Sequence, residues 1–192
     1  MTKTMTTLFF IGAITIALAG GAHAQKPDSA AQHAQMMKGM MGMTDAMFVS
    51  MMVKHHQHGI EMARLEEDRG SAASVKALAA KIRQSQEKEL TELKAHSEHM
   101  TKGTSGHGEH DKMMEQQSQS MMATLKSASG AALDHAFLEQ MVKHHEMAIS
   151  MTEGAKLLDP EVKKLAQKML TSQRQELTEL KKQLSAHGPK QP

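Results

Sequence analysis

The sequence Met-Val-Lys-His-His occurs twice in this chain, at residues 52–56 and again at residues 141–145. A second shared pattern, Gln-x-x-Glu-Leu, follows each copy, at residues 86–90 and 173–177. A likeness that recurs at a nearly fixed spacing indicates an internal duplication. The chain therefore contains two copies of a unit, and its fold should be built from two similar halves.

The N-terminal residues have the pattern of a secretory signal peptide. Residues 1–24 combine Lys3, a short apolar run and the small-residue cleavage site Ala22-His23-Ala24. We expect the secreted chain to begin near Gln25 and to act in the periplasm without a membrane anchor. Residues 25–43, rich in Met, His and Gly, are expected to form a flexible tail.

Composition excludes several classes of protein. The chain has no Cys, so it has neither disulfides nor thiolate ligands. It lacks Trp and Tyr and has a formal net charge of +2, which gives no basis for nucleic-acid binding. By contrast, 20 Met and 13 His are an unusual supply of soft and borderline metal ligands.

The apolar periodicity predicts an all-α protein with four long helices. We expect them at residues 45–68, 72–99, 132–158 and 160–186. They form two helical hairpins, at 44–100 and 131–187, joined by a Gly-, His- and Met-rich linker at 101–130 that includes a short helix near 113–128. Two amphipathic hairpins can bury their apolar faces by packing together, which predicts a four-helix bundle.

The two histidines of each repeat point in different directions. Successive residues of an α-helix are turned by about 100°, so His55 and His56 cannot serve the same purpose. His56 and its counterpart His145 fall near the centre of the apolar stripe. His55 and its counterpart His144 fall on the flank of that stripe.

The flank carries soft metal ligands at positions i, i+3 and i+7, which lie on successive turns of one helix face. They are His55, His58 and Met62, with Met51 beside them, in the first repeat, and His144, Met147 and Met151 in the second. Imidazole and thioether together favour Cu(I), and Ag(I) by analogy, over Mg²⁺ or Ca²⁺. We expect one site in each repeat. The alternative is that the methionines are ordinary core residues and the histidines lie on the surface.

For the inner histidines, His56 and His145, we expect a structural role, because a buried imidazole needs hydrogen-bond partners. The second helix of each hairpin offers one Gln and one Glu on its apolar face: Gln86 with Glu89, and Gln173 with Glu176. The alternative is that the inner histidines are themselves metal ligands. Met52 and Met141 lie beside them and are candidate ligands too, although methionines in such a stripe are more often core residues.

Other Met and His residues are expected to bind copper more weakly. They are Met36, Met37, Met40, Met41, Met43, His96, His99, Met100, His107, His110, Met113 and Met114. Apolar side chains beside Gly in a tail gain little from folding, which favours a ligand role. The alternatives are low-complexity sequence or a surface that binds a partner.

The repeated motifs resemble those of the DUF305 family. The family pattern is Asp-x-x-Phe, then Met-x-x-His-His-x-x-x-Ile-x-Met and, one helix later, Gln-x-x-Glu-Leu. It is matched at residues 45–62 with 86–93 and at residues 134–151 with 173–180. The resemblance implies an exported, ferritin-like four-helix bundle that binds Cu(I) or Ag(I) at the His-His and following Met positions. The copies differ at His58-Gly59, where the second has Met147-Ala148, so the two sites need not be equal.

The residues favour a metal-binding protein over an enzyme. No Glu is followed three residues later by His, as di-iron carboxylate bundles require, and the chain has no P-loop or nucleophile elbow. Our hypothesis is a periplasmic protein that sequesters or buffers Cu(I), or delivers it to a partner protein that accepts copper. The alternative is a Met-rich interaction or stress-adaptor bundle that grips hydrophobic partners and has no metal function.

Overall fold

The computed structural model describes residues 43–100 and 108–187, so the predicted signal peptide and nearly all of the predicted tail lie outside the described residues. Within the described residues the protein is all-α, with five helices and no strand. The helices are α2 (Asp45–Arg69), α3 (Ala73–Met100), α4 (Gly108–Lys126), α5 (Gly130–Gly154) and α6 (Pro160–His187). None of these helices is long and apolar enough to cross a membrane.

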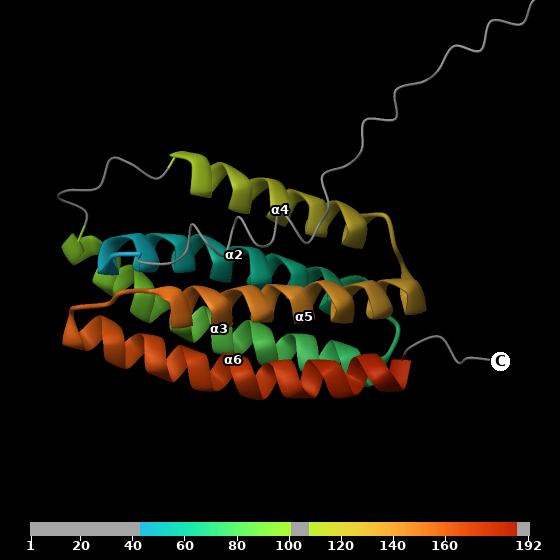
Figure 1. The fold of residues 1–192 in the computed structure, drawn as a ribbon. Helices are drawn as coiled ribbons and strands as arrows, with labels where there is room; N and C mark the ends of the chain where they lie inside the picture. Colours follow the sequence, from blue (N-terminus) through green and yellow to red (C-terminus); the bar gives the residue numbers. More distant parts are fainter. Residues whose placement is uncertain (1–42, 101–107, 188–192) are drawn as a thin grey trace, which may run out of the picture.

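Four of the helices pack side by side, and α4 lies against one side of them (Figure 1). α2 and α3 form one hairpin, and α5 and α6 form the other. The hairpins meet where α2 packs on α5 and α3 packs on α6. α2 and α5 run in opposite directions, while α4 contacts both of them and runs in the direction of α2.

The repeated apolar stripe becomes the core, and methionine fills much of it. Phe48 and Phe137, at the same position of the two repeats, are fully buried. The other large buried side chains include Met52, Met62 and Met141. Methionine is flexible and unbranched, so it can fill the gaps that a chain with few aromatic residues leaves. Burial alone therefore does not distinguish a core methionine from a metal ligand.

The third long helix is shorter than its periodicity predicts. α5 ends at Gly154, and residues 155–159 are not helical, whereas the predicted helix continued to Leu158. Glycine is a weak helix residue, and the extended segment has its own hydrogen bonds. The backbone N–H of Lys156 donates to the carbonyl oxygen of Met43 at 3.0 Å, a contact that a longer helix would prevent.

Each hairpin binds a turn of the other hairpin through one aspartate. Asp134, in the first turns of α5, accepts hydrogen bonds from the backbone N–H groups of residues 71–72, at 2.8 and 3.0 Å, and from the hydroxyl of Ser71, at 2.5 Å. Asp45, at the start of α2, accepts from the backbone N–H groups of residues 158–159 at 3.0 and 3.2 Å. The two aspartates occupy the same position of the repeat, so the duplication yields a reciprocal contact that sets the register of the hairpins.

Glu66, near the end of α2, is buried beside Asp134. Burial first, and then the neighbouring Asp134, raise the pKa of Glu66 to about 8. Burial also opposes ionisation of Asp134, but hydrogen bonds from Ser71 and Ala72 outweigh it and hold the pKa of Asp134 below its usual value. Within the described residues no donor group of another side chain reaches the Glu66 carboxyl, whose hydrogen-bonding neighbour is the carboxylate of Asp134, so an ionised Glu66 would be poorly stabilised.

Glu66 should therefore make stability depend on pH. Its folded-state pKa of about 8 lies above the usual value of 4.5, so the unfolding free energy should fall as pH rises between these values. Glu66→Gln removes this titration, so its stability advantage over the wild type should be larger at about pH 8.5 than at about pH 6.5, by roughly 2 kcal/mol. Urea unfolding at about pH 6.5 and 8.5 measures the effect. An equal difference between the two proteins at both pH values would contradict the assignment.

Candidate metal site

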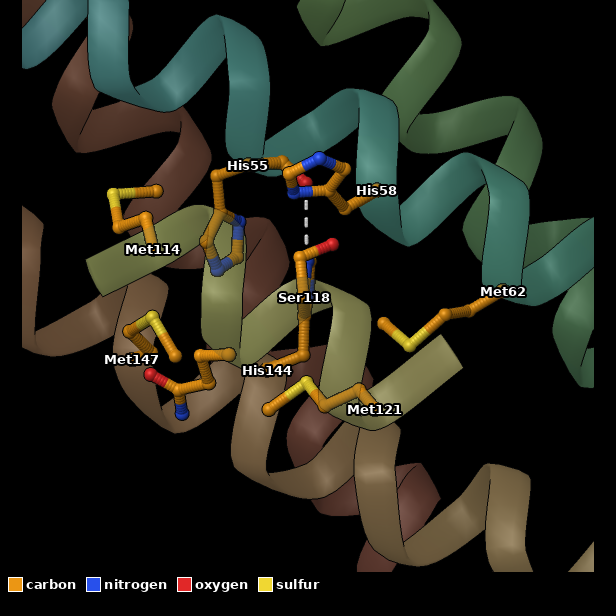
Figure 2. Close-up of a pocket in the computed structure, with 9 residues that line it drawn as sticks. His55, His58, Met62, Met114, Ser118, Met121, His144 and Met147 are labelled. Carbon is orange, nitrogen blue, oxygen red and sulfur yellow. Dashed lines mark hydrogen bonds between the residues drawn. The ribbon is translucent and has the colours of Figure 1, made fainter. Parts of the chain in front are cut away.

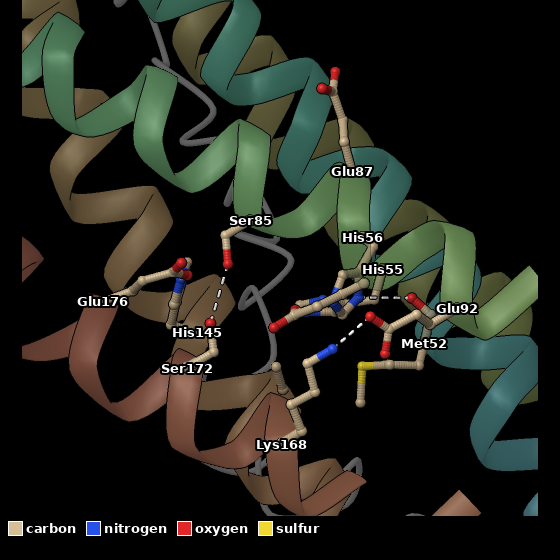
Figure 3. A network of polar contacts seen from close by, with 12 residues as sticks. Met52, His55, His56, Ser85, Glu87, Glu92, His145, Lys168, Ser172 and Glu176 are labelled. Atoms are coloured by element: carbon tan, nitrogen blue, oxygen red, sulfur yellow. Dashed lines mark hydrogen bonds and ion pairs between the residues drawn. The ribbon is translucent and has the colours of Figure 1, made fainter. Parts of the chain in front are cut away.

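The inner histidines form buried pairs with glutamates, of which Figure 3 labels His145 and Glu176. His56 Nε2 lies 2.8 Å from Glu89 Oε2, and His145 Nε2 lies 2.8 Å from Glu176 Oε2. In each ring Nδ1 donates to the carbonyl oxygen four residues earlier, at 2.9 and 3.0 Å. The pairs join the first helix of each hairpin to the second, which confirms the predicted His–Glu contacts.

These hydrogen bonds engage both nitrogens of each inner ring. Nδ1 carries a hydrogen because it donates to a carbonyl, and a further proton lies between Nε2 and the carboxyl group, whichever atom holds it. An imidazole binds a metal through a free nitrogen lone pair, so this geometry argues against His56 and His145 as ligands. Met52 and Met141, the candidates beside them, are fully buried in the core.

The two glutamines predicted in this network are buried but make no hydrogen bond. The side-chain nitrogen and oxygen of Gln86 and Gln173 have no partner among the described residues, so this part of the prediction is wrong. The reason is that each glutamate already occupies the accessible ring nitrogen. Instead Ser85 and Ser172, each next to a glutamine, form a hydrogen bond of 3.1 Å that joins α3 to α6 (Figure 3).

The outer histidines line a pocket between α2, α4 and α5 (Figure 2). Its lining residues are His55, His58, Met62, Met114, Gln117, Ser118, Met121, His144 and Met147. Five of them are predicted ligands from the two repeats: His55, His58, Met62, His144 and Met147. The spacing predicts one site in each repeat, but the structure brings both flanks to one pocket. Because α2 and α5 run in opposite directions, the same flank of each helix faces the other.

His55 and His144 meet where the two flanks join. Their ring centroids are 3.6 Å apart and their planes are inclined by 30°. His144 Nε2 donates to the backbone oxygen of His55 at 3.0 Å, so Nδ1 of His144 keeps a free lone pair. Neither this atom nor either ring nitrogen of His55 has a hydrogen-bond partner among the described residues. Buried polar atoms without partners are rare in folded proteins, which makes these nitrogens candidate ligand atoms.

Both outer rings are held in the neutral form. His55 is 2% exposed and His144 is 3% exposed. Burial, and then the charge of His144, lower the pKa of His55 well below 6.5. Burial, and then the charge of His145, lower the pKa of His144 in the same way. A neutral imidazole is the form that binds metal, so protons do not compete for these rings near neutral pH.

Gly59 makes room for the approach of His144 to α2. A Cβ atom at this position would lie 2.1 Å from Gln86 Oε1 and 2.8 Å from His144 Cε1. The equivalent residue of the second repeat, Ala148, is buried and has a side chain. The difference between the repeats that the sequence shows at this position is therefore a local adaptation of the site and not simply a weaker helix.

The pocket differs from the predicted ligand set in two ways. Met51 and Met151 are buried in the core and are not among the lining residues. α4 contributes lining residues that the repeated motif does not predict: Met114, Gln117, Ser118 and Met121. From the sequence, Met114 is expected to bind copper only weakly. The spacing of Met114 and Met121, seven residues apart on one helix, is the signal that could have placed α4 at the pocket.

Imidazole nitrogen and thioether sulfur dominate the donor set of the pocket. Within the part of the chain that the structure describes, no three His, Cys, Asp or Glu side chains gather as a metal site. One carboxylate contacts a lining residue: Glu115 Oε2 lies 3.6 Å from Nε2 of His58. Thioethers and neutral imidazoles fit the soft ions Cu(I) and Ag(I), whereas Mg²⁺ and Ca²⁺ prefer oxygen ligands.

The repeated motifs and the fold agree with one family. The model of the domain of unknown function DUF305 matches residues 15–96 and 45–184. The chain belongs to the DUF305 family. No functionally curated protein matches it.

Several solved structures are similar to this DUF305 protein. A DUF305 fragment from Deinococcus radiodurans has a TM-score of 0.64 and 26% identity, covering 74% of this chain and 95% of that one. CopM in the Cu(II)-bound form has a TM-score of 0.61 and 30% identity, covering 76% and 99%. CopM in the Ag-bound form obtained by soaking gives 0.63 and 27%, covering 78% and 100%. CopM in the Cu(I)-bound form gives 0.60 and 26%, covering 76% and 98%.

The buried pair of His145 and Glu176 should be needed for the stability of the fold and not for metal binding. His145→Leu leaves Glu176 buried without its partner and should lower the unfolding free energy by about 3 kcal/mol. The double variant His145→Leu/Glu176→Leu should recover much of this loss, because no buried charge remains. Urea unfolding and Cu(I) competition measure the two effects. If the single variant were as stable as the wild type but lost Cu(I) binding, His145 would be a ligand.

Gly59 should matter for both stability and metal binding. Gly59→Ala pushes His144 away from α2 and should lower the unfolding free energy by about 1–3 kcal/mol through overpacking, although alanine is the better helix residue. Its Cu(I) affinity should fall as well. The matched control is Ala148→Gly, which should cost about 1 kcal/mol of helix stability and leave the affinity unchanged. Unaltered Cu(I) binding by Gly59→Ala would show that the position of His144 is unimportant.

Proposed function

We propose that this DUF305 protein binds Cu(I), and Ag(I) in the same way, in the pocket between α2, α4 and α5. One observation carries the proposal: three buried ring nitrogens of His55 and His144 have no hydrogen-bond partner, and thioethers line the same pocket. Leaving such nitrogens unpaired is unfavourable in the absence of a ligand. The copper- and silver-bound structures of CopM support the same chemistry for a similar protein.

The proposed ligands have complementary properties. The neutral rings of His55 and His144 offer lone pairs that protons do not occupy near neutral pH. The thioethers of Met62 and Met147 need no deprotonation and cannot form disulfides. His58 is partly exposed, with a side-chain exposure of 20%, and would give the pocket a ligand near the solvent. Together these residues suit reversible capture of a soft ion in an oxidising compartment.

The finer features of the proposal concern cellular role and architecture. The signal peptide predicted at residues 1–24 would direct the protein to the periplasm, where it would sequester, buffer or deliver copper for metal tolerance. The packing of α2, α3, α5 and α6 supports a ferritin-like four-helix bundle, with α4 added at its side. The Met and His residues of the predicted tail would bind further ions weakly, and a second periplasmic protein would accept the metal.

Metal binding explains this pocket better than catalysis or protein–protein interaction does. The pocket is lined mainly by thioethers and imidazoles, a donor set that suits the binding of a soft ion. The adaptor alternative requires an exposed apolar surface. Within the described residues, Leu158 is the one large hydrophobic side chain that is exposed, and the methionines of the two repeats are buried. No specific observation therefore favours a second function.

A Cu(I) titration against a chelator of known affinity, under anaerobic conditions, tests the proposal. Met62→Leu/Met147→Leu keeps the volume of the side chains but removes two sulfurs, so Cu(I) affinity should fall by about tenfold or more. The matched control is Met51→Leu/Met151→Leu, which changes two buried methionines outside the pocket and should bind like the wild type.

A chain trimmed to residues 44–186 separates the pocket from the tail in the same titration. Tight binding that survives trimming supports the pocket. Binding that disappears on trimming would move the function to the N-terminal methionines, and no binding by either chain would remove the metal proposal altogether.

A further inference from the structure

We propose that α4 supplies one thioether to each of two Cu(I) positions in the pocket, Met114 to the first and Met121 to the second. This inference rests on the proposed function, because it assigns further ligands and a stoichiometry to the same pocket. The repeated motif does not predict it, since α4 has no counterpart in the duplicated unit. It follows from where α4 lies and from which of its side chains face the pocket.

α4 turns one narrow face toward the pocket. Met114 and Met121 are each 5% exposed, although α4 is the outermost of the five described helices. They are seven residues apart, which is about two turns, so they lie on the same face. Gln117 and Ser118, between them on that face, also line the pocket. Both sulfur-bearing side chains are therefore directed inward together with polar neighbours, which is unlike a purely apolar contact.

The two methionines lie toward different ends of the pocket (Figure 2). Met114 lies at the end where Met147 and His55 are seen, and Met121 lies toward the end of Met62. The helix directions give the same order. α4 and α2 run the same way, so the earlier residue of α4, Met114, lies beside His55, and Met121 lies beside Met62, seven residues further along α2.

The position of the thioethers favours two ions over one. Met114 and Met121 lie about two turns apart, with Cα atoms separated by about 10.5 Å along the helix axis. Each has a different thioether of the repeats at its own end of the pocket, Met147 for Met114 and Met62 for Met121. The first position would combine Met114 with Met147 and the stacked rings of His55 and His144. The second would combine Met121 with Met62 and His58.

Other residues already hold α4 on the helical core. Leu125, near the end of α4, is fully buried. Glu115 Oε2 lies 3.6 Å from Nε2 of His58 on α2. These contacts supply the apolar and electrostatic attachment that a structural helix needs. Met113 and Met122, on the same helix, are only partly buried and do not line the pocket. They are the matched controls, because they share the helix and the residue type but not the proposed role.

The test is a titration of the full-length protein with Ag(I), followed through the methyl resonances of 13C-methyl methionine. Met114→Leu, Met121→Leu, Met113→Leu and Met122→Leu assign the signals and keep the apolar volume. We expect the methyls of Met114 and Met147 to shift together, and those of Met121 and Met62 to shift together, while the controls stay in place. Met114→Leu should weaken the response of Met147 by about tenfold and leave that of Met62 unchanged.

Each other outcome has a definite meaning. Shifts of Met62 and Met147 without shifts of Met114 and Met121 would overturn the role of α4 and leave the proposed function standing. Loss of the Met62 response in Met114→Leu would overturn the two positions in favour of one shared ion. If the methyl resonances of Met62, Met114, Met121 and Met147 all stayed unshifted, the proposed function itself would fail. Far-UV circular dichroism and thermal unfolding of each variant confirm that it is folded.

Discussion

The contact between His144 and His55 is the feature on which the pocket depends. The ring of His144 can reach the backbone of α2 only because Gly59 has no side chain, and its hydrogen bond to the carbonyl of His55 then fixes the ring. Fixing Nε2 as the donor leaves Nδ1 as the acceptor, so one hydrogen bond determines both orientation and tautomer. The stacked ring of His55 completes a pair of neutral imidazoles at the junction of the two flanks.

The duplicated His-His dipeptide divides two tasks between neighbouring residues. The inner ring of each copy binds a glutamate of its own hairpin and has no lone pair to spare. The outer ring turns about 100° away and enters the pocket. A buried ion pair is weak support for stability in general, since desolvation offsets much of its attraction. In this protein the His–Glu pair fixes the rotation of the helix, so the outer ring of each repeat lies on the flank that faces the other hairpin.

The sequence predicts local features well and their assembly less well. Helical periodicity and the Asp159-Pro160 start predict the helices of both hairpins. The rotation of about 100° per residue distinguishes the inner histidines from the outer ones. The end of α5 is missed because a tertiary contact, from Lys156 to Met43, competes with helical propensity. The merging of two flanks into one pocket is missed because periodicity carries no information on how two helices face each other. The short helix near 113–128 is predicted, but its place at the pocket is missed for the same reason: the methionines of α4 become informative only once its position is known.

The reciprocal aspartates have a consequence for how the protein comes apart. Asp45 belongs to the first hairpin but satisfies backbone groups of the second, and Asp134 does the converse. Neither hairpin thus contains all the acceptors that its own turns use. The two hairpins of this single chain are arranged like the subunits of a symmetric dimer. Each hairpin is stabilised in part by the aspartate of the other. Loss of one half exposes unpaired backbone donors in the other, so the two halves should unfold in a single cooperative step.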